Sequence, residues 1–127
     1  MSRILLVDDD VDLAELVRTK LSAEGHELHV IHTGDGAFEK AKEVRPEMAI
    51  LDIMLPGLDG YQVCKLIRAN EAAKEVPVVM ISGKDGFFDK VRGRMAGTTG
   101  YITKPFGPET LMKALETYLI PEAAGAE

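Results

Sequence analysis

The sequence contains a single cysteine, Cys64, and no long run of apolar residues. One cysteine cannot form an internal disulfide or a CxxC zinc site, so neither of these builds the fold. The apolar run near the start, 4–7, is far shorter than the core of a signal peptide or the roughly 18 residues of a membrane-spanning helix. A secreted, membrane-spanning or disulfide-built protein is therefore not expected, and we predict a soluble cytoplasmic domain.

Basic residues are fewer than acidic residues. The 127 residues include 15 Lys and Arg against 21 Asp and Glu, which gives a formal net charge of −6. Because affinity for nucleic-acid backbones comes largely from Lys and Arg, we expect no direct binding to nucleic acid. The length fits one domain, and a chain of this size buries a core without a metal or disulfide.

Short apolar runs alternate with amphipathic stretches about five times along the chain. The runs predict strands at 4–7, 28–30, 48–51, 76–81 and 101–103. Helical spacing predicts inward-facing positions between and after them, at Leu13, Leu16, Val17 and Leu21, then Ala37, Phe38, Ala41 and Val44, then Val63, Leu66 and Ile67, then Phe88, Val91 and Met95, and finally Leu111, Met112, Leu115 and Leu119.

Five strand–helix units of this kind predict an α/β fold, a five-stranded parallel sheet with helices on both faces. We expect the domain to occupy residues 1–120, with a small, polar and disordered tail at 121–127. Only a few residues follow the last predicted helix, so we expect a stand-alone protein in preference to a piece of a longer one.

Polar residues follow the predicted strands at the points where the strands end. They are Asp8, Asp9, Asp10, Asp52, Ser82 and Lys104. Ligands of open α/β sheets bind beyond the carboxyl ends of the strands. If the first and third strands are neighbours, the carboxylates of Asp8, Asp9 and Asp52 converge on one pocket, with a hydroxyl and an ammonium at its rim.

Converging carboxylates predict a cation and a reaction. Like charges at short range favour a hard divalent ion, and oxygen ligands suit Mg²⁺. A carboxylate beside Mg²⁺ can attack a phosphoryl group to give an aspartyl phosphate, with Lys104 and Ser82 neutralising and positioning it. Structural roles are the alternative: Asp10 is expected to cap a helix, and singly Ser82 and Lys104 would be a loop serine and a solvated lysine.

Four segments in order resemble the receiver domain of response regulators in two-component signalling. They are Ile4–Asp10, Leu51–Gly60, Ile81–Gly83 and Tyr101–Phe106. The similarity runs from Arg3 to about Leu119. It implies a flavodoxin-like strand order 2-1-3-4-5, which the apolar pattern alone does not give.

The resemblance implies a role for each carboxylate. Asp52 would accept a phosphoryl group from a sensor histidine kinase or a phosphotransfer protein. Mg²⁺ would be bound by Asp9, Asp52 and the backbone carbonyl of Met54, and Asp8 would help directly or through water. Lys104 would pair with the phosphoryl oxygens.

The resemblance also implies a switch. Ser82 would move to hydrogen-bond the phosphoryl group, and Tyr101 would rotate into the space that Ser82 leaves. The surface formed by the fourth helix, the fifth strand and the last helix would then change for a downstream partner. The Lys104–Pro105 peptide would be cis.

Two other functions stay open from the sequence. The chain could be a receiver-like docking module that is never phosphorylated, although its full set of strand-end residues argues against this. It could also be a small metal-dependent phosphatase. Turnover of a phosphate ester in excess over protein would distinguish the phosphatase, and we expect none, only phosphorylation and dephosphorylation of the domain itself.

Overall fold

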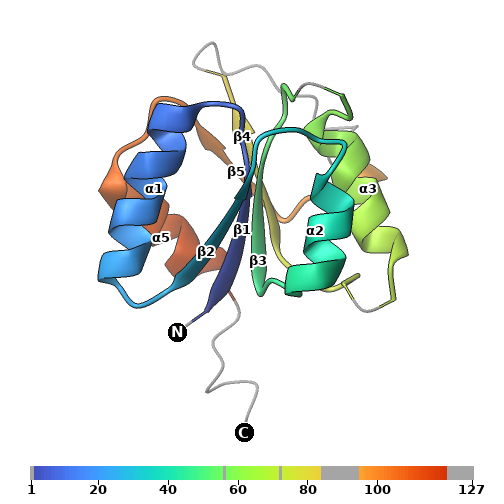
Figure 1. Cartoon of the computed structure of the whole chain (residues 1–127), viewed down its shortest axis with the longest axis horizontal. Helices are drawn as coiled ribbons and strands as arrows, with labels where there is room; N and C mark the ends of the chain where they lie inside the picture. The colour runs from blue at the N-terminus through green and yellow to red at the C-terminus, as the bar shows by residue number, and fades with distance from the viewer. Residues whose placement is uncertain (1, 56, 72, 84–94, 120–127) are drawn as a thin grey trace, which may run out of the picture.

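One parallel sheet of five strands forms the centre of the protein (Figure 1). The structure, a computed structural model, describes residues 2–55, 57–71, 73–83 and 95–119. The strands lie in the order β2-β1-β3-β4-β5, which confirms the predicted α/β class and the flavodoxin-like order. Their bounds are β1 Arg3–Val7, β2 Glu27–Ile31, β3 Met48–Asp52, β4 Val78–Ser82 and β5 Gly100–Thr103.

Helices cover both faces of this sheet. Figure 1 shows α1 (Val11–Ala23) and α5 (Pro108–Tyr118) on one face, and α2 (Ala37–Val44) and α3 (Gly60–Ala69) on the other. No helix in the described part of the chain is long and apolar enough to cross a membrane. Covering both faces explains why the strands are apolar without alternation.

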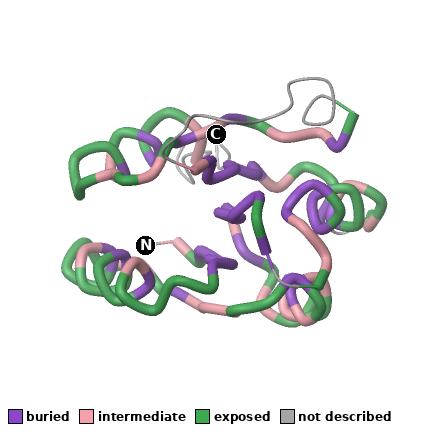
Figure 2. The backbone as a smooth tube through the Cα atoms, turned by 90° about the horizontal axis from the view of Figure 1, so that it is seen from above, coloured by how far each residue is buried: buried purple, intermediate pink, exposed green. Residues whose placement is uncertain are grey.

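The two faces of the sheet have separate cores. Along β1, Ile4 and Leu6 pack with α1 and α5, whereas Leu5 and Val7 pack with α2 and α3. Successive side chains of a strand point to opposite faces, so one apolar strand contributes side chains to both cores. In Figure 2 buried purple segments lie in the middle of the molecule, and the outer sides of the helices are exposed.

Three residues predicted to face inward are exposed instead. Leu16 is 40% exposed, Leu66 is 37% exposed and Met95 is 72% exposed. An amphipathic stripe is often wider than the part of a helix that touches the sheet. On α1 the buried stripe follows Ala14, which is small enough to let the helix approach, and on α3 the buried Cys64 takes the place expected for Leu66.

Asp10 and Pro77 set the starts of two elements. The backbone N–H of Leu13 donates to Asp10 Oδ1 at 3.0 Å, so Asp10 caps α1 as predicted. β4 begins two residues later than predicted, because Pro77 has no N–H to give to a ladder. The predicted tail at 121–127 and the Phe88 and Val91 positions of the predicted fourth helix lie outside the described residues.

Candidate functional site: an acidic cluster at the carboxyl edge of the sheet

The register of β1 and β3 brings three carboxylates together. Val7 pairs with Leu51 across the ladder, so the residues that follow each of them lie at the same edge. One carboxylate oxygen from each of Asp8, Asp9 and Asp52 lies within 4.8 Å of the other two. The convergence predicted from the strand ends is therefore present. Asp8 is fully buried and Asp52 is 7% exposed, whereas Asp9 is exposed.

Lys104 reaches this cluster from the loop after β5. Its Nζ lies 3.0 Å from Asp52 Oδ2 and 3.1 Å from Asp8 Oδ2. The Lys104–Pro105 peptide is cis, as expected. Burial alone would lower the pKa of the Lys104 ammonium, but its hydrogen bonds with Asp52 and Asp8 outweigh burial and raise the pKa above its usual range. The lysine is therefore a fixed positive charge.

Asp8 is the carboxylate whose negative charge is most clearly under-compensated. The pKa of Asp8 is raised from 3.8 to about 6. Burial is the largest cause and the negative charge of Asp52 adds to it, while the N–H of Asp10 and the Lys104 ammonium act in the opposite direction. Asp10 N donates to Asp8 Oδ1 at 2.8 Å. Asp8 Oδ2 is buried without a hydrogen bond in the described structure, since Lys104 approaches it only as an ion-pair partner.

The donor set fits a hard divalent cation. Three carboxylates lie together, but the one lysine beside them pairs only with Asp8 and Asp52, and a buried oxygen of Asp8 has no hydrogen bond among the described residues. A buried charge without full compensation is costly, and Mg²⁺ is bound by oxygen ligands of this kind. The residues present therefore match the chemistry of a magnesium site.

Asp52 is held at both of its oxygens. The backbone N–H of Met54 donates to Asp52 Oδ1 at 2.9 Å, and Lys104 occupies Oδ2. The loop after β3 also returns close to Asp52, because a Cβ added to Gly60 would lie 2.5 Å from the Asp52 carbonyl oxygen. The Met54 side chain is 75% exposed at the rim. A carboxylate held in this way presents a defined direction to an incoming group.

Ser82 and Tyr101 lie on the neighbouring strands but bond elsewhere. Ser82 is fully buried at the carboxyl end of β4, and its hydroxyl donates to Thr103 Oγ1 at 3.2 Å. Tyr101 on β5 is half-buried and accepts a hydrogen bond from Thr98 Oγ1 at 3.2 Å. Sequence reasoning missed both threonine partners, because neither has a motif.

Two further contacts near the cluster were not predicted. Gly34 lies so close to the loop after β3 that an added Cβ would be 1.8 Å from the Leu58 carbonyl oxygen. His32 Nδ1 lies 2.9 Å from the Asp8 carbonyl oxygen, so this exposed turn histidine touches the backbone of the site. The group of possible metal ligands found among the described residues consists of Asp8, Asp9 and Asp52 and contains no histidine.

Comparison with known proteins identifies the family. Residues 4–116 match the response regulator receiver domain. The chain therefore belongs to the receiver-domain family of two-component signalling. The expectation drawn from the four strand-end segments is confirmed.

Two relatives show how the chain compares in length. It is 38% identical to protein PilG of Pseudomonas aeruginosa over 117 residues, which cover 92% of this chain and 87% of PilG. It is 41% identical to the DNA-binding response regulator MtrA of Mycobacterium tuberculosis over 117 residues, which cover 92% of this chain and 50% of MtrA. The chain thus spans about half the length of MtrA.

Two solved structures share the fold closely. The chemotaxis response regulator CheY4 of Vibrio cholerae has a TM-score of 0.85 and 31% identity, covering 92% of this chain and 98% of CheY4. The receiver domain of the sensor histidine kinase PA1611 from Pseudomonas aeruginosa has a TM-score of 0.84 and 28% identity, covering 93% and 97%. The PA1611 structure has a magnesium ion coordinated in its active-site cleft.

Proposed function

We propose that this receiver domain is a phosphorylation-dependent switch in which Asp52 accepts a phosphoryl group from a sensor histidine kinase or a phosphotransfer protein. The observation that carries the proposal is the setting of Asp52. Its carboxylate lies at the open edge of the sheet, fixed by Met54 N–H and Lys104, beside the carboxylates of Asp8 and Asp9. The domain occupies residues 1–120 and acts in the cytoplasm.

Asp9, Asp52 and the Met54 carbonyl would hold Mg²⁺, with Asp8 directly or through water. The ion supplies charge neutralisation to phosphoryl oxygens when bound. The mismatch between three carboxylates and one lysine supports this assignment, and so does the magnesium in the PA1611 receiver.

The transfer itself is a displacement at phosphorus. A carboxylate oxygen of Asp52 forms the new P–O bond while the P–N bond to the donor histidine breaks, and the imidazole leaves with the electron pair. Lys104 already lies 3.0 Å from the attacking carboxylate, so its ammonium can follow the phosphoryl oxygens with little movement. The residues mainly position and neutralise the group, which is where most of the rate enhancement of such transfers arises.

The phosphoryl group would then change the hydrogen bonds of Ser82 and Tyr101. It adds about −1.5 to −2 charge and three acceptor oxygens. The Ser82 hydroxyl would exchange Thr103 for a phosphoryl oxygen, and Tyr101 would leave Thr98 and turn inward. The surface of the fourth helix, β5 and α5 would change with them, and a downstream partner would bind there.

Intact mass spectrometry tests the proposal. After incubation with acetyl phosphate and Mg²⁺, the wild type should gain about 80 Da, the mass of one phosphoryl group, and Asp52→Asn should gain nothing. Asp12→Asn, which removes an exposed carboxylate from the first turn of α1, is the matched control and should behave like the wild type. Labelling that persists in Asp52→Asn would refute the acceptor, and an unlabelled wild type would favour the docking module.

A further inference from the structure

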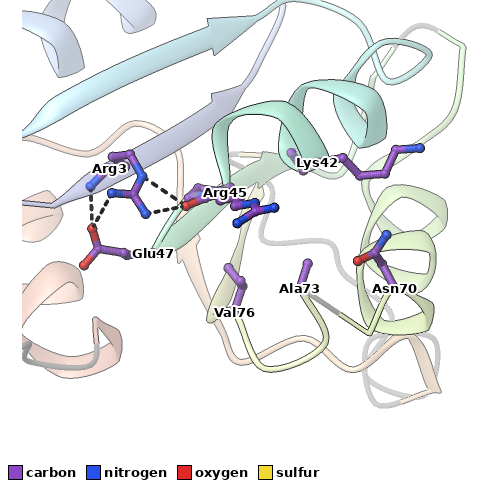
Figure 3. A pocket seen from close by; sticks show the side chains of 9 residues that line it. Arg3, Lys42, Arg45, Glu47, Asn70, Ala73 and Val76 are labelled. Atoms are coloured by element: carbon purple, nitrogen blue, oxygen red, sulfur yellow. Dashed lines mark hydrogen bonds and ion pairs between the residues drawn. The ribbon is translucent and has the colours of Figure 1, made fainter. Parts of the chain in front are cut away.

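A cavity opens at the edge of the sheet opposite to Asp52. Its volume is about 360 Å³, and its lining includes Arg3, Arg45, Pro46, Asn70, Ala73 and Val76 (Figure 3). These residues come from the start of β1, the end of α2, the connection from α2 to β3, and the connection from α3 to β4. Pockets for small molecules usually measure roughly 300–1,000 Å³, so this cavity suits a small ligand.

The lining combines an apolar floor with charged groups at the rim. Ala41, Pro46 and Ala73 are buried, and Val76 is half-buried. Together they offer methyl and methylene groups to a ligand. Desolvating such a surface favours an apolar body, at about 25 cal/mol for each Å² of apolar area removed from water.

Two of the three basic residues at the rim already have partners. The Arg3 guanidinium donates to the carbonyl oxygens of Val44 and Arg45 at 3.0–3.2 Å, and it pairs with Glu47 at 3.8 Å. Lys42 pairs with Glu39 at 2.9 Å, and its ammonium points away from the cavity in Figure 3. The charges of Arg3 and Lys42 are therefore matched.

Arg45 is different in both backbone and side chain. It ends α2 in the left-handed region, with φ 53° and ψ 62°, where glycine is the usual residue. The Arg3 guanidinium donates to the Arg45 carbonyl oxygen, and the Arg45 N–H donates to the Ala41 carbonyl oxygen at 2.9 Å. Its guanidinium has no hydrogen bond or ion pair among the described residues, and in Figure 3 it lies at the end of α2, above the floor residues Ala73 and Val76.

We propose that this cavity binds a small monocarboxylate with an apolar body. The carboxylate pairs with the Arg45 guanidinium, whose planar fork matches two carboxylate oxygens, and the apolar body covers Ala73 and Val76. A single unmatched cation suits one negative charge. A phosphate dianion fits less well, because no second unmatched cation lies in the described lining and the carboxyl end of α2 carries partial negative charge.

Amide NMR shifts in ¹⁵N-labelled protein test the site, with 3-phenylpropanoate as the probe and neutral 3-phenylpropanamide as its matched control. We expect a millimolar dissociation constant, so the titration extends to about 10 mM ligand. The amide shifts of Arg45, Ala73 and Val76 should saturate over this range, and the amide shift of Asp52 should not change. The amide should bind at least about tenfold more weakly, because it cannot form the charge-assisted pair.

Two variants separate binding from folding. Arg45→Gly should weaken binding of 3-phenylpropanoate by about tenfold or more, while its unfolding midpoint stays the same or rises, because glycine adopts the left-handed conformation without strain. Lys42→Gln should bind like the wild type. The proposal is wrong if carboxylate and amide bind equally, if Arg45→Gly binds as well as the wild type, or if no shifts occur at the cavity.

Discussion

The ammonium of Lys104 lies 3.0 Å from Oδ2 of Asp52, although β4 separates the strand of Asp52 from the strand that precedes Lys104. The same nitrogen lies 3.1 Å from Oδ2 of Asp8. One cation thus serves two buried carboxylates that belong to different strands. This sharing leaves the site short of positive charge, and it makes both stability and metal binding depend on the protonation of Asp8.

Asp8 should make the metal-free protein less stable as the pH rises. Its pKa is about 6 in the folded state against 3.8 when unperturbed, so between these values the folded state binds more protons than the unfolded state. Stability therefore falls from about pH 4 to pH 6, by roughly 3 kcal/mol if each pKa unit is worth about 1.4 kcal/mol.

Asp8→Asn isolates this effect, because asparagine keeps an oxygen acceptor for the N–H of Asp10 and does not titrate. Urea unfolding with a chelator present, at pH 4 and pH 6.5, should show a smaller fall for the variant than for the wild type. At pH 6.5 the variant should be the more stable of the two. Parallel curves for the two proteins would contradict the assignment of the shift to Asp8.

Magnesium should stabilise the folded protein through the acidic cluster. At a concentration 100 times the dissociation constant, a ligand that binds only the folded state adds about 2.7 kcal/mol. Asp9→Asn removes an exposed carboxylate of the cluster, so it should fold normally and lose most of this gain. Asp12→Asn should keep it. Urea unfolding with and without Mg²⁺ measures the difference, and equal gains in all three proteins would remove Asp9 from the site.

Much of the site was predictable because parallel strands align their ends. Asp8 and Asp52 each follow an unbroken apolar run, and both fall at one edge once β1 and β3 are neighbours. Whether β1 and β3 are neighbours depends on the strand order. That order was predicted from the family resemblance and not from the apolar pattern. The capping role of Asp10 was predictable for a local reason, since the cap and its N–H donor are three residues apart.

Two side-chain and loop contacts between distant parts of the chain were not predictable in the same way. Ser82 bonds to Thr103 across a strand pair, and Gly34 touches Leu58 between two loops. Neither contact has a periodic spacing along the chain. The exposure of Leu66 has a related cause, because the period of a helix gives the direction of its apolar face but not the width of the contact.

Gly34 should be required for the position of the loop after β3. In Gly34→Ala the added Cβ would lie 1.8 Å from the Leu58 carbonyl oxygen, so one loop must move. We expect a loss of roughly 1–3 kcal/mol in unfolding free energy, as for other overpacked sites, and weaker Mg²⁺ binding.

Gly36→Ala is the matched control for Gly34→Ala. An added Cβ at Gly36 meets nothing within 4 Å, and its φ of −94° is ordinary for alanine. The control should be neutral or more stable by up to about 1 kcal/mol. Urea unfolding and magnesium titration of both variants provide the test, and similar behaviour of the two would show that the close approach at Gly34 is unimportant.

The single thiol should be unreactive while the protein is folded. Cys64 is fully buried, donates to the Ala96 carbonyl oxygen at 3.2 Å, and has its pKa raised to about 11 by burial. At pH 8 only about one thiol in a thousand is then ionised. Reaction with a disulfide reagent should be much slower in buffer than in urea, and equal rates would show that the thiol is accessible.

The position of the phosphoryl group is the most direct test of the central claim. After reaction with acetyl phosphate and Mg²⁺, borohydride reduces an aspartyl phosphate to homoserine, and peptide sequencing by mass spectrometry then locates that residue. We predict homoserine at position 52 alone, and none when Mg²⁺ is removed by a chelator. Homoserine at position 8 or 9, or its complete absence from a protein that had gained the mass of a phosphoryl group, would contradict the assignment of Asp52 as the acceptor.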